Sequence, residues 1–149
     1  MINIEDLFIS QPALCAIASI DEFRGRWQGR GGIDETLAAR LKEMGNYTLR
    51  VNTNGLADCI TGRNAAPEMH GLLDIVSVSL NAPTAEKYDA VCHSKYGPEA
   101  FDAMLHFTKN VPHVVMTVVS TMPAEDIEAC RKLCENAGAK FRVREYISE

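Results

Sequence analysis

From residue 33 onward, the chain alternates between segments in which apolar residues recur at helical spacing and short runs rich in β-branched residues. The β-branched runs predict strands at residues 47–51, 75–80, 114–119 and 140–147. Helices are predicted at residues 33–44, 67–70 and 85–92, from residues 97–98 onward, and from Pro123 to Ala137. Such alternation builds βαβ units with right-handed crossovers, which pair their strands in parallel. The sequence therefore predicts an α/β fold with a mostly parallel sheet.

The first 33 residues show no comparable pattern. Residues 13–20 are apolar and fit either a strand or a buried helical turn, which periodicity alone does not separate. Residues 24–32 are too rich in glycine for a helix or a central strand and predict a loop or an irregular tail. We therefore divide the chain into an irregular or divergent segment, residues 1–33, and an α/β domain, residues 34–149.

Composition narrows the classes of partner. A length of 149 residues suits one domain, and a net charge of −5 argues against a nucleic-acid binder. Arginines among the glycines of residues 24–32 resemble RNA-contacting segments, but the acidic balance of the whole chain outweighs them. No apolar run reaches the length of a membrane span, and the first residues lack the pattern of a signal peptide. Five scattered cysteines do not form a secreted disulfide framework, so we expect a cytoplasmic protein.

Polar residues occur at the end of each predicted strand. They are Asn52, Thr53 and Asn54, then Ser79 and Asn81, then Ser120 and Thr121, and last Arg144 and Glu145. In parallel α/β folds, ligands bind at the carboxyl ends of the strands. Short hydroxyls and amides suit a sugar, a carboxylate or an amino group as ligand. The same residue types also make good turns, so both interpretations stay open at this point.

Three segments resemble the TatD-associated radical S-adenosylmethionine (SAM) proteins. Residues 50–56, RVNTNGL, are similar to the third strand of the radical SAM barrel and its Thr-Asn-Gly turn. Residues 74–83, DIVSVSLNAP, followed by Tyr88, resemble the fourth strand and helix, and residues 141–146, FRVREY, resemble the closing strand. The resemblance covers roughly residues 34–149. It implies an incomplete radical SAM barrel, which is a partial TIM-barrel-like fold.

In that family, a Cys-x-x-x-Cys-x-x-Cys loop binds a four-iron cluster, and the cluster reduces SAM to a radical. No three cysteines of this chain have that spacing, and the Gly-Glu-Pro-type turn is also absent. The resemblance therefore implies a truncated or degenerate member, without a 4Fe-4S cluster and without radical activity by itself. Whether the chain is an enzyme stays open.

The resemblance also implies cofactor-binding positions. Thr53 and Asn54 match the third-strand turn, Ser79 and Asn81 match the fourth-strand end that faces SAM, and Arg144 matches a last-strand position in the same cavity. With the first half of the barrel missing, we expect weak SAM binding. The alternative is a non-catalytic domain that binds a protein or a small molecule. An incomplete parallel sheet leaves an open edge, which a second copy or a partner chain would cover.

The cysteines and histidines offer weaker candidates. Cys130 and Cys134 are four residues apart on a predicted helix, but they share its apolar stripe, which favours buried structural cysteines over a metal site. Cys59, near the strand ends, is the best candidate for a reactive thiol. The histidines at positions 70, 106 and 113 fall at helix ends or before a strand and are expected to be exposed, and none forms a recognisable triad.

Overall fold

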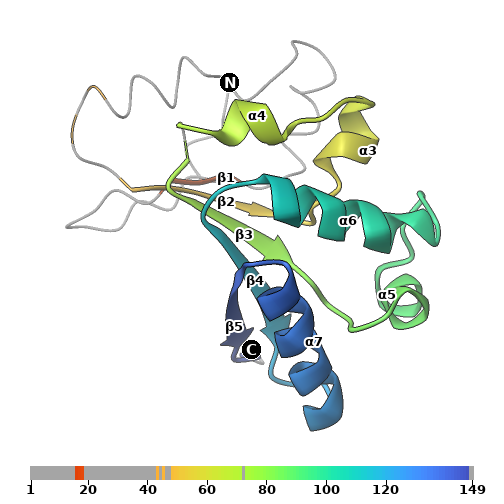
Figure 1. Ribbon diagram of the computed structural model, residues 1–149. Helices are drawn as coiled ribbons and strands as arrows, with labels where there is room; N and C mark the ends of the chain where they lie inside the picture. The colour runs from red at the N-terminus through yellow and green to blue at the C-terminus, as the bar shows by residue number, and fades with distance from the viewer. Residues whose placement is uncertain (1–15, 19–42, 44, 46–47, 72, 148–149) are drawn as a thin grey trace.

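The computed structural model describes residues 16–18, 43, 45, 48–71 and 73–147 (Figure 1). In this part of the chain, five strands form one sheet: β1 (Ala16–Ala18), β2 (Leu49–Thr53), β3 (Ile75–Ser79), β4 (Val114–Val119) and β5 (Lys140–Arg144). Every neighbouring pair is parallel, and the order across the sheet is the order along the chain. The predicted α/β fold with a parallel sheet is therefore confirmed.

Five helices follow the strands in the described residues. They are α3 (Ala57–Thr61), α4 (Ala66–Met69), α5 (Ala85–Cys92), α6 (Glu99–Asn110) and α7 (Ala124–Asn136). The bounds of α5 and β4 agree with the sequence prediction, and α4, α6, α7 and β3 differ from it by a residue or two at their ends. Helix α3 has no counterpart in the prediction, because its five residues are too few to show a periodicity. The helix predicted at residues 33–44 lies almost entirely outside the described residues.

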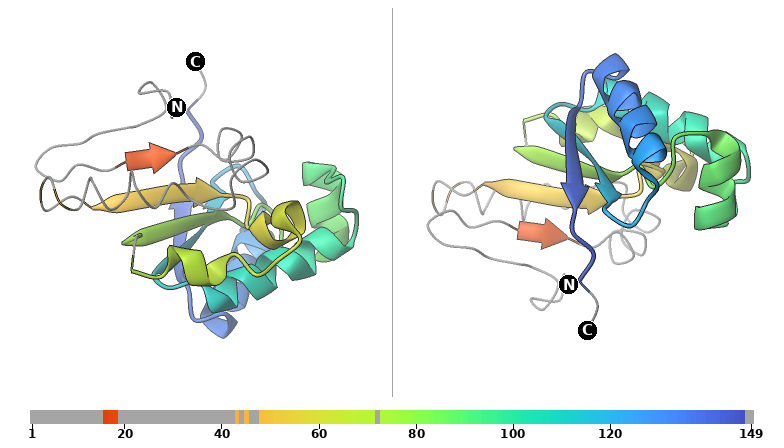
Figure 2. Two further views of the ribbon diagram at one scale, coloured as in Figure 1. Left: turned by 90° about the horizontal axis from the view of Figure 1, so that it is seen from above. Right: turned by 90° about the horizontal axis from the view of Figure 1, so that it is seen from below.

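The described helices lie on the same side of the sheet (Figures 1 and 2). Alternate residues of the strands, among them Val51, Val76, Val78, Met116 and Val118, are buried beneath these helices. Helix α5 contacts α6 through the rings of Tyr88 and Phe101, whose centroids are 5.6 Å apart. Helix α7 covers β4 and β5, where Arg131 lies over the ring of Phe141 at 4.8 Å. The core of the described residues therefore lies between the sheet and these helices.

The opposite face of the sheet is rich in polar side chains. Strand residues alternate between faces, so the neighbours of the core residues point away from the helices. The register places Asn52 beside Ser77, and places Ser79, Thr117 and Arg142 in one row. We call the face that carries Arg50, Asn52, Ser77, Ser79, Thr117, Lys140, Arg142 and Arg144 the polar face; Ile75, Val115 and Val119 also lie on it.

Candidate binding site at the carboxyl edge of the sheet

The carboxyl ends of the strands meet at one edge of the sheet, because all the pairs are parallel. A cavity of about 570 Å³ opens at this edge beside the ends of β2 and β3. Two residues of its lining come from the strand ends: Asn54 directly follows β2, and Asn81 lies two residues beyond the end of β3. The rest comes from the start of α3 and from the end of α5: Leu56, Ile60, Tyr88, Val91, Cys92, His93, Ser94, Lys95 and Tyr96. We call this space the carboxyl-edge cavity.

The Thr-Asn-Gly turn after β2 is held by its own side chains. The hydroxyl of Thr53 accepts a hydrogen bond from the Gly55 amide at 3.0 Å, and Oδ1 of Asn54 accepts one from the Leu56 amide at 3.1 Å. Gly55 has a φ of +75°, which glycine adopts without steric cost. Thr53 is buried on the side of the sheet that faces the helices. Thr53 therefore supports the turn, whereas Asn54 lines the cavity and its Nδ2 group donates to no described residue.

Asn81 occupies a strained turn after β3. Its φ is +63°, and the amide of Ala82 donates to the carbonyl of Leu80 at 2.8 Å, which closes a three-residue γ-turn. A residue other than glycine in this conformation costs free energy that the surrounding structure must offset. The Nδ2 group of Asn81 donates to Sγ of Cys92 at 3.5 Å. This contact fixes the amide against the end of α5 and leaves Oδ1 as an acceptor.

The ionisable groups around the cavity favour binding over nucleophilic chemistry. Burial, followed by the nearby Cys92 thiol, raises the pKa of the Tyr88 phenol well above its ordinary value. Burial also raises the pKa of the Cys59 thiol, and the carboxylates of Asp58 and Glu99 add to this effect. A raised pKa keeps a thiol protonated and therefore unreactive at neutral pH. Cys59 is thus poorly suited to the role of reactive thiol that its position in the sequence favours.

The charge of the cavity lining is positive. Lys95 belongs to it, and none of the described lining residues is acidic. The ammonium group of Lys95 lies 4.9 Å from the centroid of the Tyr96 ring, a cation–π contact. No ion pair joins Lys95 to a carboxylate among the described residues. The lining therefore suits a neutral or anionic ligand better than a cationic one.

The five sequence-predicted site residues fall into three groups. Asn54 and Asn81 line the carboxyl-edge cavity together, and Thr53 lies buried under the helices. Ser79 and Arg144 are outside the lining of that cavity and belong to the polar face. Arg144 is exposed, and its carbonyl accepts a hydrogen bond from the amide of Ser120 at 2.9 Å. The residues share one edge of the sheet but are divided between its two faces.

The polar face has its own hydrogen bonds. Nη2 of Arg50 donates to Oγ of Ser77 at 3.0 Å, and its Nε donates to Oδ1 of Asn52 at 3.3 Å. The hydroxyl of Thr117 donates to the carbonyl of Val78 at 3.4 Å. Ser77 and Thr117 are buried, whereas Arg142 and Arg144 are exposed. The guanidinium groups at the carboxyl end of β5 are therefore accessible beside fixed hydroxyls.

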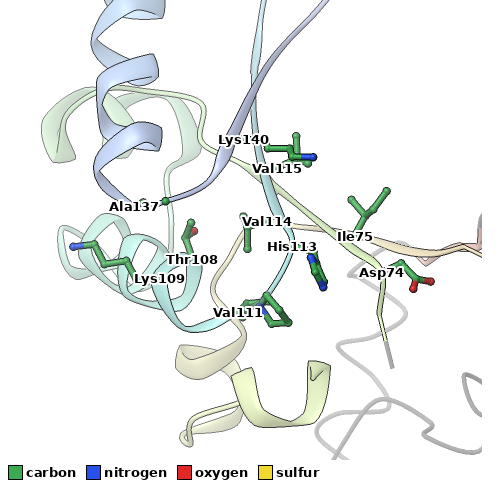
Figure 3. A pocket seen from close by; sticks show the side chains of 12 residues that line it. Asp74, Ile75, Thr108, Lys109, Val111, His113, Val114, Val115, Ala137 and Lys140 are labelled. Carbon is green, nitrogen blue, oxygen red and sulfur yellow. The ribbon is translucent and has the colours of Figure 1, made fainter. Parts of the chain in front are cut away.

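A second cavity, of about 500 Å³, lies at the amino edge of the sheet (Figure 3). Its lining includes Asp74, Lys109, His113 and Lys140, and its floor is the apolar start of β3 and β4. Oδ2 of Asp74 accepts a hydrogen bond from the Leu49 amide at 2.7 Å, which ties β2 to the start of β3. Since ligands of parallel sheets bind at the carboxyl ends of the strands, we give the carboxyl-edge cavity priority.

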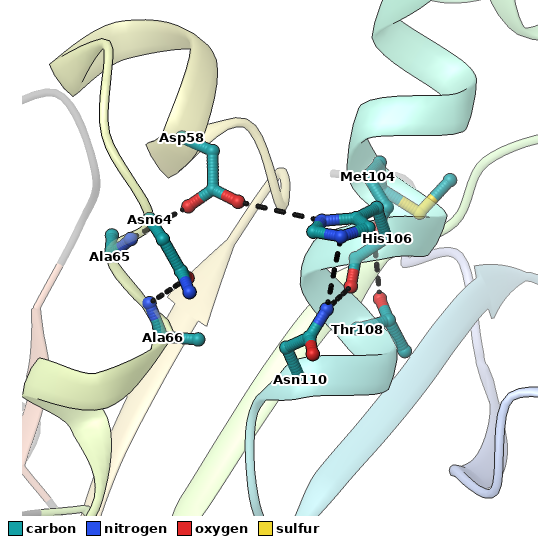
Figure 4. A network of polar contacts seen from close by, with 8 residues as sticks. All are labelled: Asp58, Asn64, Ala65, Ala66, Met104, His106, Thr108 and Asn110. Carbon is teal, nitrogen blue, oxygen red and sulfur yellow. Dashed lines mark hydrogen bonds and ion pairs between the residues drawn. The ribbon is translucent and has the colours of Figure 1, made fainter.

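A polar network joins α3 and the segment after it to α6 (Figure 4). Oδ1 of Asp58 accepts a hydrogen bond from the Ala65 amide at 2.9 Å, and its Oδ2 lies 3.8 Å from Nδ1 of His106. Asn110 contacts the carbonyl of His106 at 2.8 Å. The prediction that His70, His106 and His113 are exposed is confirmed. The network fixes α3, which supplies Ile60 to the carboxyl-edge cavity.

The two cysteines of α7 belong to the core. Cys130 and Cys134 are fully buried, and burial raises their pKa values to about 11 and about 12. The predicted burial of the two cysteines is therefore confirmed. Within residues 48–71 and 73–147 and the short described pieces before them, no three metal-ligating side chains come together.

Sequence inspection does not identify the segment that closes the carboxyl-edge cavity. Residues 91–96 fold back beside the ends of β2 and β3 from the end of α5, where His93 has a φ of +45°. A chain reversal at a residue other than glycine leaves no compositional signal. Tyr88, three residues before this segment, is the nearby residue that could have indicated the cavity from the sequence, because it is an aromatic residue on the inner face of α5.

This chain matches no family model, no curated protein and no solved structure. None of the helices in the described part of the chain is long and apolar enough to cross a membrane.

Proposed function

We propose that this chain is a cluster-free relative of the radical SAM barrels, which binds SAM or S-adenosylhomocysteine weakly at the carboxyl end of its polar face. The strand order supports a segment of a singly wound barrel. Strands that follow one another in chain order, with their helices on one side, are the repeating unit of a (β/α) barrel. A doubly wound sheet would reverse its strand order and place helices on both faces.

The observation that carries the proposal is the polar character of the second face. Parallel sheets are normally covered on both faces by helices, and their strands are then apolar on both sides. Here one side of β2 to β5 is buried under helices, while the other presents hydroxyls, amides and guanidinium groups. Such a face fits the inner wall of a barrel that surrounds a polar ligand.

The donor set at the carboxyl end suits the amino-acid part of SAM. The guanidinium of Arg144 can form a bidentate pair with a carboxylate. Ser79 lies at the end of β3 on the same face and offers a hydroxyl to a ribose or an amino group. Arg144 is exposed, so its charge carries no large desolvation cost before a ligand binds. A half-open site of this kind supports binding at roughly millimolar to high-micromolar strength.

The cysteines do not fit a four-iron cluster. The sequence lacks the required triplet, and Cys130 and Cys134 are buried in the core beneath α7. A radical SAM cluster uses three thiolates that are close together, and leaves the fourth iron for SAM. We therefore propose binding without radical chemistry by this chain alone.

Titration calorimetry with S-adenosylhomocysteine tests the proposal. Arg144→Ala is expected to weaken binding about tenfold, because it removes a charge-assisted hydrogen bond to the carboxylate. Lys140→Ala is the matched control, because Lys140 lies on the same face of the same strand, about 13 Å away at its amino end. No binding by the wild-type chain at several millimolar, or equal losses in the two variants, contradicts the proposal.

A second candidate function is binding of another protein chain at the β5 edge. In the described sheet β5 is an edge strand, and the residues after it, Tyr146 and Ile147, are 65% and 84% exposed. Large apolar side chains beside an edge strand favour association with a second chain. Light scattering at tens of micromolar should then show a dimer that Ile147→Lys converts to a monomer. A wild-type monomer at that concentration counts against a homodimer.

A further inference from the structure

In the lining of the carboxyl-edge cavity, Nδ2 of Asn54 and Oδ1 of Asn81 have no hydrogen-bond partner among the described residues. Oδ1 of Asn54 is occupied by the Leu56 amide, and its Nδ2 donates to no described residue. Asn81 has the opposite arrangement, because its Nδ2 donates to Cys92 and its Oδ1 accepts from no described residue. The two amides therefore offer an N–H group and a carbonyl oxygen to the same space.

A ligand that satisfies both groups must present both an acceptor and a donor. The edge of adenine does so, because its exocyclic amino group donates and the adjacent ring nitrogen accepts. The aliphatic side chains of Leu56, Ile60 and Val91 also line the cavity and provide apolar surface for a flat ring. Val91 is 62% exposed and places uncovered apolar surface at the cavity.

The charge of the lining adds a preference for an anion. Lys95 is an exposed, positively charged member of a lining that contains no acidic residue among those described. Since the whole chain carries a net charge of −5, this local excess of positive charge is not the average of the surface. The volume, about 570 Å³, lies within the usual range of small-molecule sites.

We propose that the carboxyl-edge cavity is a binding site for an adenine nucleotide, separate from the polar face. Asn54 and Asn81 contact the edge of the base, and Lys95 contacts the phosphate. The strained γ-turn at Asn81 and the contact with Cys92 hold the amide in place before the ligand arrives. The site belongs to the helix-covered side of the edge, so it does not depend on the proposed function of Arg144.

Comparison of AMP with purine riboside monophosphate tests the assignment. The two ligands share ribose and phosphate, but purine riboside has a hydrogen atom in place of the amino group that donates to Asn81. Titration calorimetry on the full chain should show AMP bound about tenfold more tightly than purine riboside monophosphate. Equal affinities, or no AMP binding at several millimolar, would overturn the proposal whatever the variants show.

Two variants separate the base contact from the phosphate contact. Asn81→Gly removes the amide and keeps the backbone, because glycine accepts a φ of +63°. It should abolish the preference for AMP over purine riboside monophosphate, whereas Lys95→Gln should weaken the binding of both ligands by a similar factor. An Asn81→Gly variant that keeps the preference contradicts the proposal.

Arg144→Ala distinguishes this site from the polar face. AMP affinity should be unchanged in Arg144→Ala, because Arg144 does not line the carboxyl-edge cavity. A loss of AMP binding in that variant would place the nucleotide on the polar face and overturn the inference. If Arg144→Ala binds S-adenosylhomocysteine as tightly as the wild-type protein does, the proposed function is contradicted, but the nucleotide site is not.

Discussion

Gly55 illustrates how one residue couples the candidate site to the core. It has a φ of +75°, and a Cβ atom built on it would lie 2.7 Å from Cγ of Met104 and 3.2 Å from Cγ1 of Val78. The backbone of the β2–α3 turn therefore packs directly against α6. Because Asn54 belongs to the same turn, its position in the carboxyl-edge cavity depends on this close approach.

Gly55→Ala should destabilise the protein by about 2–4 kcal/mol, through the strained φ and the clash with Met104. Gly62→Ala is the matched control, because Gly62 has a φ of +69° but nothing within 4 Å of the new Cβ. It should cost about 1–2 kcal/mol, the conformational part alone. Urea denaturation measures the free energy of unfolding of both variants. Equal decreases would contradict the prediction, because they would show that the clash with Met104 adds no destabilisation.

At the scale of elements, α7 shows how spacing on a helix decides the role of a cysteine pair. Cys130 and Cys134 are four residues apart and both lie on the inner stripe of α7, against the sheet. Both are fully buried, and burial is the main cause of their raised pKa values. The same spacing on an exposed face would place two thiols where a metal could reach them.

Replacement of both cysteines by alanine should lower the free energy of unfolding by about 1–3 kcal/mol at neutral pH, because two buried sulfur atoms leave small cavities. Metal content, measured on the purified protein, should be the same before and after the change. Ala129, a helix neighbour that is half-buried, provides the control variant Ala129→Ser, which should cost less. A variant of unchanged stability that has lost bound zinc would identify a metal site.

The raised thiol pKa values also give the wild-type protein a stability that depends on pH. A thiol whose pKa is higher in the folded state holds its proton more tightly there than in the unfolded chain. Its contribution to stability therefore falls once the pH is high enough for the unfolded chain to lose that proton. The contribution is therefore fully present below about pH 9 and is lost as the pH rises toward about 11 to 12. The double alanine variant should show a smaller fall in stability over this window, and parallel curves would contradict the pKa shifts.

At the scale of the whole molecule, the sheet separates two chemical environments. Helices bury one face, and the other carries the side chains that we propose as a SAM-type site. The carboxyl-edge cavity lies on the helix-covered side of the same edge. A domain with this arrangement can hold two ligands without shared side chains.

Anaerobic reconstitution with iron and sulfide should yield no stoichiometric four-iron cluster, and SAM should remain uncleaved. The physical reason is that the chain lacks three thiolates at the spacing that such a cluster requires. Visible absorption reports the cluster, and chromatography of the reaction mixture reports 5′-deoxyadenosine. A redox-active cluster together with SAM cleavage would show that other ligands replace the missing cysteines.

The sequence by itself determined the class of fold and most of its elements. The alternation of 3.6-residue and β-branched patterns is a local property, so α5, β4 and the inner stripe of α7 could be read directly from the residues. The parallel pairing of the strands also followed, because helical crossovers connect parallel strands. Polar residues at the strand ends could likewise be assigned to one edge.

Only the tertiary structure decided which of those polar residues come together. The side of the sheet that a residue faces depends on register and pleat, and a shift of one residue reverses it. Thr53 is thereby buried, Asn54 and Asn81 share a cavity, and Ser79 and Arg144 occupy the polar face. The cavity also needs residues 91–96, which reach it because a positive φ at His93 turns the chain back. Neither register nor that reversal is encoded in a local pattern, so the site had to be read from the fold.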